Sequence, residues 1–271
     1  MPTRYDSSLI TMLRRLDAVR LEQVGSGFLL QVGDHHFLIS AAHVLIESTL
    51  ELPTSPSLRL EHAGHILASS SFDSPDNPGD RYDVGCIHLT PDAVARLTAI
   101  GRTFLNLPDI ARNFPPVAPI VCVFAGFPAS FSKMQVGLKQ VVSTPTYIRG
   151  EKLSDDQVRA VGHDPRFNFG MAYNREQVTT EETNQRVTGP VAIGMSGGPV
   201  WLILPDGRPL LVGIGTHYDP DKNTLIGSLV VPLIMEAMRR YAGEPIAVSV
   251  QSGPPLAAIP PEPASDGNRQ G

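Results

Sequence analysis

The fold of this chain is decided by one stretch, Gly194-Met195-Ser196-Gly197-Gly198-Pro199, which runs directly into the apolar segment Val200-Trp201-Leu202-Ile203-Leu204. Glycines near Ser196 on both sides leave its hydroxyl exposed and the backbone unhindered. The N–H groups of Gly194 and Ser196 can point at one spot, as the stabilisation of an oxyanion requires. Because a serine hydroxyl is a weak nucleophile on its own, the chain must also supply a base and a group that orients it.

The same stretch also fits the pattern G-x-S-x-G, in which a strand turns sharply into a helix at a nucleophilic serine. That arrangement needs a helix directly after the serine, and an acid and a histidine later in the chain. Here Pro199 and a strand-like run follow, and His217 is the only later histidine in the sequence. A setting between strands is therefore favoured for Ser196.

Composition favours a chain of many short strands. Of 271 residues, 24 are glycine and 25 are proline, and turn formers at this density suit short strands better than long helices. Hydrophobic residues make up 42% and charged residues 18%, enough for a sizeable core. The net charge of -5 comes without a run of Lys or Arg, which argues against a nucleic-acid partner. No apolar stretch reaches the length of a membrane-spanning helix, about 18 residues.

Apolar runs bounded by turn residues recur along the chain. Residues 28–32 and 37–41 flank Gly33-Asp34 and predict a hairpin. Further strands are expected at 66–72, 84–89, 119–127, 135–147, 200–204, 210–214 and 225–231, and helices at 91–100, 154–161 and 232–241. Apolar residues at helical spacing within residues 1–20 predict an amphipathic N-terminal helix. We therefore expect an all-β fold with a C-terminal helix.

Two segments upstream of Ser196 can supply the base and its orienting group. His43 follows an apolar, strand-like run and two alanines, which places it to face a cleft. Asp83 opens the apolar segment Val84-Gly85-Cys86-Ile87. A carboxylate buried there is costly unless it is hydrogen-bonded, and an imidazole N–H is a suitable partner.

Three segments in the order His, Asp, Ser carry a family resemblance. Ser40-Ala41-Ala42-His43, Asp83-Val84-Gly85 and the stretch around Ser196 together resemble the signature of the chymotrypsin/trypsin-like serine proteases, over residues 20–242. The resemblance implies two antiparallel β-barrels with the site between them. It also implies His43 as general base, Asp83 as its orienting group and Ser196 as nucleophile, with the N–H groups of Gly194 and Ser196 as oxyanion donors. No cofactor and no metal are expected.

The chain also departs from the secreted members of that family. The resemblance puts Met195 where those members carry an aspartate that pairs with a freshly cut N-terminus, and a methionine cannot form that pair. The cysteines that flank the histidine and the serine in those members are missing. The chain is therefore most similar to disulfide-free, bacterial-type members, which need no activating cut.

Three residues are candidates for substrate specificity. The segment before the serine, which contains Pro190, holds no acid, so a preference for Lys or Arg is not expected. In one alignment with the family, His217 stands where a histidine reads Glu or Gln in glutamyl endopeptidases and viral 3C-like proteases. In another, Thr216 stands where a serine hydroxyl supports the aspartate. The sequence leaves both alignments open.

The expected organisation has four parts. They are an amphipathic helix (1–20), a first β-barrel with His43 and Asp83 (21–115), a second β-barrel with Ser196 and the C-terminal helix (116–243), and a disordered Pro-rich tail (244–271). No export signal is evident, and the only cysteines, Cys86 and Cys122, sit in apolar runs. We therefore expect a cytoplasmic protein with buried free thiols.

The function that these residues favour is that of a serine endopeptidase acting on a polypeptide through an acyl-enzyme. The alternative is a catalytically inactive trypsin-like module for peptide binding or docking. No nucleic-acid or membrane partner is expected. A polar segment at 150–187 and the Pro-rich tail leave room for a regulatory protein partner.

Overall fold

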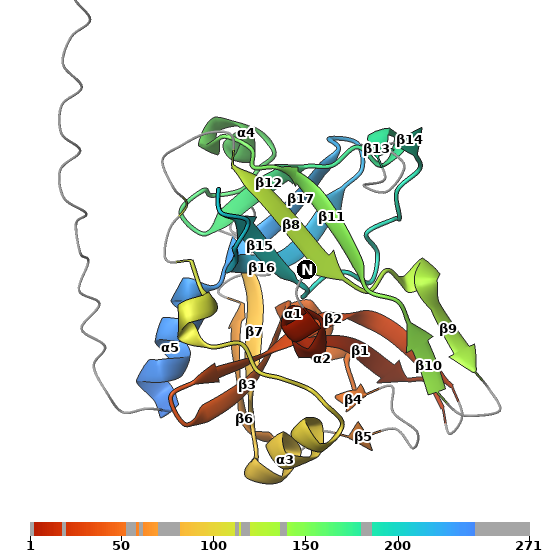
Figure 1. Ribbon diagram of the computed structural model, residues 1–271, viewed down its shortest axis with the longest axis vertical. Helices are drawn as coiled ribbons and strands as arrows, with labels where there is room; N and C mark the ends of the chain where they lie inside the picture. Colours follow the sequence, from red (N-terminus) through yellow and green to blue (C-terminus); the bar gives the residue numbers. More distant parts are fainter. Residues whose placement is uncertain are drawn as a thin grey trace, which may run out of the picture.

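The computed structural model describes residues 3–17, 20–52, 58–59, 62–69, 82–111, 114, 120–135, 140–179 and 186–241. The expected tail at 244–271 lies outside these residues. Two large antiparallel sheets form the body of the molecule, one above the other in Figure 1, and short helices lie around them. The expectation of an all-β fold is confirmed.

The first sheet is formed by the N-terminal part of the chain and has the strand order β5-β4-β1-β2-β3-β7-β6. Its strands are β1 (Leu9–Arg15), β2 (Leu21–Val32), β3 (His35–Ser40), β4 (Glu51–Leu52), β5 (Leu58–Arg59), β6 (His62–Ser69) and β7 (Asp83–Leu89). The expected hairpin is present: Val32 pairs with His35, and Gly33 takes a φ of 58° in the turn. A glycine suits this left-handed conformation because it has no Cβ.

The second sheet has the strand order β11-β8-β15-β16-β17-β12. Its strands are β8 (Val121–Gly126), β11 (Thr146–Glu151), β12 (Asn168–Ala172), β15 (Pro199–Ile203), β16 (Pro209–Asp219) and β17 (Thr224–Leu229). Its two edge strands approach each other, since Lys152 bridges Met171 and the N–H of Leu153 donates to the carbonyl of Gly170 at 2.8 Å. These contacts curl the second sheet toward a closed barrel.

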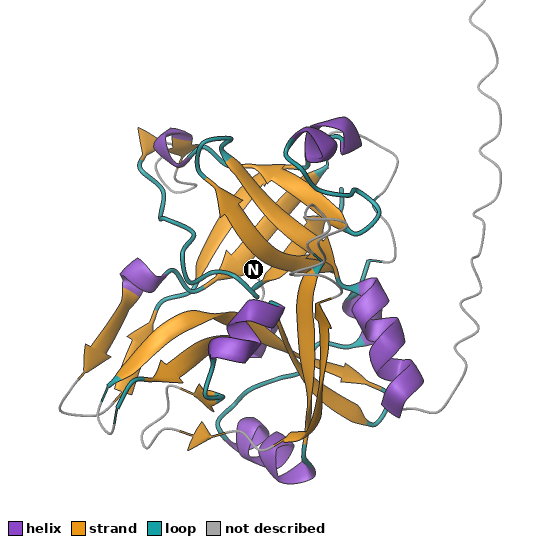
Figure 2. Ribbon diagram, turned by 180° about the vertical axis from the view of Figure 1, so that it is seen from behind, coloured by secondary structure: helices purple, strands orange, loops and turns teal. Residues whose placement is uncertain are grey.

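Two small ribbons and several short helices complete the fold. The ribbons pair β9 (Ser132–Gln135) with β10 (Gln140–Ser143), here called the β9–β10 arm, and β13 (Val178–Thr179) with β14 (Arg186–Val187). The helices are α1 (Thr3–Ser8), α2 (Ala42–Glu47), α3 (Pro91–Ala99), α4 (Asp155–Ala160) and α5 (Val231–Tyr241), with 3-10 turns at Leu107–Asp109, Ala129–Phe131 and Arg175–Gln177. The expected C-terminal helix is thus confirmed as α5 (Figure 2). No helix within the described ranges is long and apolar enough to cross a membrane.

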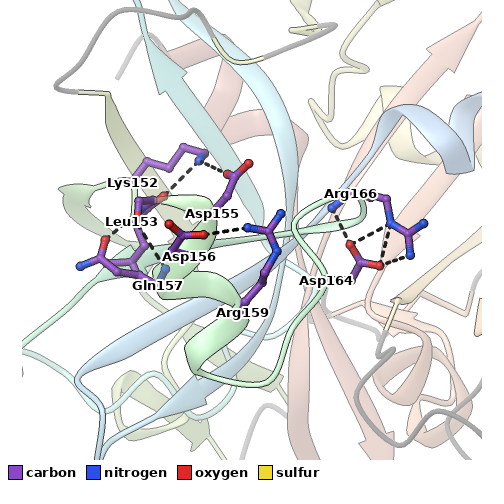
Figure 3. A network of polar contacts seen from close by, with 9 residues as sticks. Lys152, Leu153, Asp155, Asp156, Gln157, Arg159, Asp164 and Arg166 are labelled. Atoms are coloured by element: carbon purple, nitrogen blue, oxygen red, sulfur yellow. Dashed lines mark hydrogen bonds and ion pairs between the residues drawn. The ribbon is translucent and has the colours of Figure 1, made fainter.

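Helix α4 begins where its sequence predicts. The Ser154 hydroxyl accepts a hydrogen bond from the N–H of Gln157, and the Gln157 side chain accepts one from the N–H of Ser154. Asp156 and Arg159 form an ion pair of 2.9 Å on the exposed face of the helix (Figure 3). Exposed pairs of this kind contribute at most about 1 kcal/mol, so this network stabilises its own segment only.

The N-terminal segment is where the expectation of a helix over residues 1–20 was wrong. Helix α1 ends at Ser8, and β1 then pairs with β2, with Leu9 opposite Phe28. Leu9, Ile10, Met12 and Leu13 are all buried, so apolar side chains fill both faces of this strand. A short apolar run that is buried on both faces has no clean period, and periodicity alone cannot separate it from a helix.

The core continues from one sheet into the other. Phe28 of β2 and Trp201 of β15 are fully buried in one apolar cluster that also includes Leu233 and Ala237 of α5. The ring of Tyr5 meets the Trp201 ring edge-on at 4.6 Å. Buried aromatic surface of this kind dominates core energetics, so the two sheets are held as one body.

Candidate active site

His43 and Asp83 are brought together by the register of the first sheet. Ser40, at the end of β3, pairs with Gly85 of β7, which places the residues just after β3 beside the first residue of β7. His43 lies there in the first turn of α2, and Asp83 is the first residue of β7. One oxygen of Asp83 is 2.5 Å from Nδ1 of His43, and the other accepts the N–H of His43 at 3.1 Å.

The Asp83 carboxylate sets the charge state of His43. Asp83 is buried, with 4% of its surface exposed, while His43 is partly exposed. Burial of the His43 ring opposes its protonation, but the hydrogen bond and the negative charge of Asp83 together outweigh burial and raise the pKa of His43 above its ordinary value. A basic imidazole with one nitrogen held by a carboxylate keeps its other nitrogen available as a proton acceptor.

Ser196 lies in a turn that joins the two sheets. We call residues 192–198 the serine loop. The Ser196 carbonyl accepts the N–H of Ser26 on β2 at 2.8 Å, and the N–H of Gly197 donates to Gly215 on β16 at 2.7 Å. The Ser196 side chain is partly buried, and its hydroxyl donates to the carbonyl of Thr216 at 3.4 Å.

The serine hydroxyl is therefore turned toward β16 and makes no hydrogen bond to His43 within the described part of the chain. The segments that carry the two residues both approach Gly25 of β2. A Cβ placed on Gly25 would lie 2.5 Å from the side chain of Val44, the neighbour of His43, and 2.9 Å from the Ser196 carbonyl. A hydrogen bond between Ser196 and His43 stays a prediction, and the Ser196 hydroxyl must leave the Thr216 carbonyl to form it.

The glycine after Ser196 makes this approach sterically possible. Gly197 has a φ of 88°, and a Cβ there would lie 2.0 Å from Oγ of Ser40 and 2.1 Å from the carbonyl of Ser26. Any side chain at position 197 would push the serine loop away from the end of β3. Gly197 therefore allows the serine loop to pack directly against the end of β3, the strand that leads to His43.

Four N–H groups of the serine loop make no hydrogen bond among the described residues, those of Ala192, Ile193, Gly194 and Ser196. Gly194 and Ser196 are the predicted oxyanion donors. The carbonyl before each of them is engaged: Ile193 accepts the N–H of Ala129 at 2.8 Å, and Met195 accepts the N–H of Gly198 at 3.0 Å. In a planar trans peptide the N–H points away from the carbonyl. The N–H of Gly194 therefore points away from Ala129, and the N–H of Ser196 points away from Gly198. Their role as donors to an oxyanion stays a prediction.

The remaining predicted site residues lie near this loop. The carbonyl of Pro190 accepts the hydroxyl of Tyr173 at 2.7 Å. The Thr216 hydroxyl is buried and donates to the carbonyl of Ile226 at 3.4 Å rather than to Asp83. His217 follows it on β16 with an exposed side chain. Their roles in specificity stay predictions.

The described residues contain no group of three or more His, Cys, Asp and Glu side chains placed to hold a metal ion. Two residues that sequence reasoning missed do reach the serine loop: Gln23 and Ser26 of β2 both hydrogen-bond to the carbonyl of Gly194. The one signal for them is the run Gly25-Ser26-Gly27, because small residues inside a strand mark a close backbone approach.

Comparison with known proteins bears on the fold alone. The sequence matches no family model, and no curated protein matches it. Among solved structures, the chain is similar to neuropsin, a serine protease expressed in the limbic system of mouse brain, with a TM-score of 0.51 and 17% sequence identity. The match covers 88% of this chain and 96% of neuropsin. The chain therefore has the fold of a trypsin-like serine protease.

Proposed function

We propose that this protein is a serine endopeptidase that cleaves polypeptides through an acyl-enzyme. The observation that carries the proposal is the His43–Asp83 pair, joined at 2.5 Å, in a sheet whose strand β2 also hydrogen-bonds to the Ser196 carbonyl. A trypsin-like fold alone does not imply activity. Acyl transfer of this kind uses a buried carboxylate, an imidazole with a raised pKa and a serine hydroxyl. The proposal assigns these groups to Asp83, His43 and Ser196.

In the proposed reaction, the Ser196 hydroxyl first turns from Thr216 to the free ring nitrogen of His43. His43 takes the proton as the serine oxygen bonds to the peptide carbonyl carbon, and Asp83 stabilises the resulting imidazolium. The carbonyl oxygen becomes an oxyanion held by the N–H groups of Gly194 and Ser196. His43 then returns the proton to the leaving amine, and water hydrolyses the acyl-enzyme by the same route. Loss of one oxyanion donor typically costs about 10²- to 10³-fold in kcat.

A fluorophosphonate probe tests the proposal without knowledge of the substrate. Its phosphorus bonds to Ser196 Oγ, fluoride leaves, and the serine proton goes to His43. We expect intact-mass labelling at one site in the wild type, and none in Ser196→Ala or His43→Ala. Absence of labelling in folded wild-type protein would instead favour the inactive peptide-binding module. Thermal unfolding of each variant provides the control for folding.

Substrate preference forms the second part of the proposal. We place Pro190, Thr216 and His217 at the substrate-binding side of the site, with His217 recognising Glu or Gln. A peptide library cleaved by the wild type and by His217→Ala tests this assignment. A preference for Glu or Gln that disappears in the variant supports it, and an unchanged preference removes it.

The cellular location is the third part of the proposal. Cys86 and Cys122 are both buried and form no disulfide, and burial raises the pKa of Cys122 to about 12. Such thiols stay unreactive and suit a reducing compartment, so we propose a cytoplasmic protein.

A further inference from the structure

The serine loop needs contacts that hold its conformation, because Gly194 has no side chain to restrict its backbone. Gly194 has a φ of 87°, and glycine populates conformations on both sides of zero almost equally. A reversal of the peptide before Gly194 would turn away the Gly194 N–H, and the peptide after Gly194 lies between the two peptides that carry the proposed oxyanion donors. Met195, which follows, is apolar and fully buried, so it cannot anchor the loop through charge.

Ser26 reaches this loop from the first sheet with a fully buried hydroxyl. It donates to the carbonyl of Gly194 at 2.9 Å and accepts the N–H of Phe127 at 2.8 Å. Because the Phe127 N–H can only donate, the Ser26 hydroxyl acts as acceptor toward it and uses its own hydrogen in the bond to the Gly194 carbonyl. The hydroxyl therefore has one orientation, and so does the peptide that follows Gly194.

Gln23 holds the same carbonyl from the other side. Its Nε2 donates to Gly194 at 3.2 Å and also to the carbonyl of Phe127. Its Oε1 accepts the hydroxyls of Ser132 and Ser143, one from each strand of the β9–β10 arm. The amide is thus oriented by its partners: its oxygen faces two hydroxyls and its nitrogen faces two carbonyls.

We propose that Ser26 and Gln23 are positioning residues that hold the serine loop in its reactive conformation, with the β9–β10 arm fixing Gln23. This inference rests on the proposed endopeptidase function. The clamp is uncharged and joins the two sheets directly, so it needs neither an aspartate at position 195 nor a free terminal amine. It holds the peptide between Gly194 and Met195, and through it the two neighbouring peptides that carry the Gly194 N–H and Ser196 N–H groups, and it acts without touching the substrate.

Removal of the clamp should affect the chemical step and spare substrate binding. In Ser26→Ala, the buried Gly194 carbonyl and Phe127 N–H each lose a partner, and the loop gains alternative conformations. An oxyanion exists only in the transition state and the tetrahedral intermediate, so misaligned donors lower kcat and leave KM nearly unchanged. We expect kcat to fall about 10- to 100-fold, less than for complete loss of a donor.

The experiment compares Ser26→Ala with Ser8→Ala as a matched control. The hydroxyl of Ser8 is equally buried and donates to a backbone carbonyl at 2.8 Å, but that carbonyl belongs to Tyr5 within its own helix. Each variant is measured in two ways. Hydrogen exchange by mass spectrometry follows the amides of residues 192–198, and steady-state kinetics on a peptide cleaved by the wild type gives kcat and KM.

The clamp is supported if Ser26→Ala speeds exchange in the serine loop and lowers kcat at constant KM while Ser8→Ala does neither. It is overturned if exchange in the loop and kcat are unchanged, or if both variants lose activity equally. Should Ser26→Ala fail to fold, Gln23→Met, which keeps the length and removes the hydrogen bonds, is judged by the same criteria. If wild-type protein neither labels nor cleaves, the endopeptidase proposal fails by itself, and loop exchange in the variants still decides the clamp.

Discussion

Asp83 makes two hydrogen bonds to one residue, and this fixes both the ring and the backbone of His43. One oxygen holds Nδ1 at 2.5 Å, and the other holds the backbone N–H at 3.1 Å. The first bond selects the tautomer with its proton on Nδ1, which leaves Nε2 as the acceptor. The second keeps α2 from rotating relative to β7. A single buried carboxylate thus determines which ring nitrogen of His43 is left free to accept a proton.

The raised pKa of His43 predicts the pH dependence of activity. The base must be neutral, so kcat/KM should rise with pH through the pKa of His43, which lies above its ordinary value of about 6.5. In Asp83→Asn the negative charge of Asp83 is gone while burial and the smaller contribution of Glu47 remain, so this rise should move to lower pH. The rate itself should fall by about 10³- to 10⁴-fold. The check is a pH–rate profile of both proteins, and a wild-type rise centred below the ordinary histidine value would contradict the assignment.

Gly197 offers a test of close packing at the scale of one residue. Gly197→Ala must place a Cβ 2.0 Å from Oγ of Ser40 and force a left-handed backbone on alanine. Gly207 has a similar φ of 81° but nothing within 4 Å of the added Cβ, so Gly207→Ala carries the backbone cost alone, about 1–2 kcal/mol. We expect Gly197→Ala to lower the free energy of unfolding by at least about 2 kcal/mol more than the control. Urea unfolding measures the free energy of unfolding of both variants. An equal loss in the two would contradict the prediction, because the serine loop would then have moved to make room for the new Cβ.

At the scale of elements, helix α5 closes over a pair of histidines on the first sheet. Nδ1 of His35 on β3 lies 3.2 Å from Nε2 of His88 on β7, and the His88 ring packs against Tyr241 of α5 at 4.4 Å. Nδ1 of His88 is buried without a partner among the described atoms. Burial, with the nearby His35 and His36, lowers the pKa of His88.

The packing of His88 against α5 predicts that low pH weakens the contact between this helix and the first sheet. Because the pKa of His88 is lower in the folded protein, the unfolded chain binds the proton first, and stability falls as pH drops below about 6.5. His35, His36, Tyr241 and Arg240 are the titratable neighbours that remain in His88→Phe. We expect the Tm of the wild type to fall more between pH 7.5 and pH 5 than that of the variant, by about 2–4 °C. If the Tm of the wild type and of His88→Phe fell equally between pH 7.5 and pH 5, this role of His88 would be ruled out.

At the scale of the whole molecule, Tyr82 joins the two sheets next to the candidate site. It precedes Asp83, and its hydroxyl donates to the carbonyl of Leu229 at 2.7 Å while accepting the N–H of Leu233 at 3.1 Å. Burial raises the pKa of this hydroxyl, so it stays protonated and able to donate. One side chain therefore connects the start of β7, the end of β17 and the first turn of α5.

Loss of that hydroxyl should destabilise the assembly of the two sheets. Tyr82→Phe keeps the ring but leaves a carbonyl and an N–H without this partner, at a cost of about 1–3 kcal/mol in the free energy of unfolding. Tyr147→Phe is the matched control, because its hydroxyl bonds Asp6 at the exposed surface, and we expect a loss below about 1 kcal/mol. Denaturant unfolding compares them, and equal effects would mean that Tyr82 does not connect the sheets.

The sequence by itself determined the strand-rich fold class, the C-terminal helix and the three segments that carry His43, Asp83 and Ser196. Each rests on a local signal: glycines around a serine, apolar runs between turn residues, or a proline opening a helix and a glycine closing it. Local signals act over a few residues, so one sequence shows them without knowledge of the partner strands.

Only the tertiary structure decided what depends on pairing between distant segments. Leu9–Arg15 is a strand because β2 accepts it as a neighbour, and its apolar pattern allowed a helix equally well. Ser26 meets Gly194 across 168 positions of sequence, and the Ser196 hydroxyl meets a carbonyl of β16. Contacts of this length follow from strand register and sheet packing, which no short stretch of sequence encodes alone.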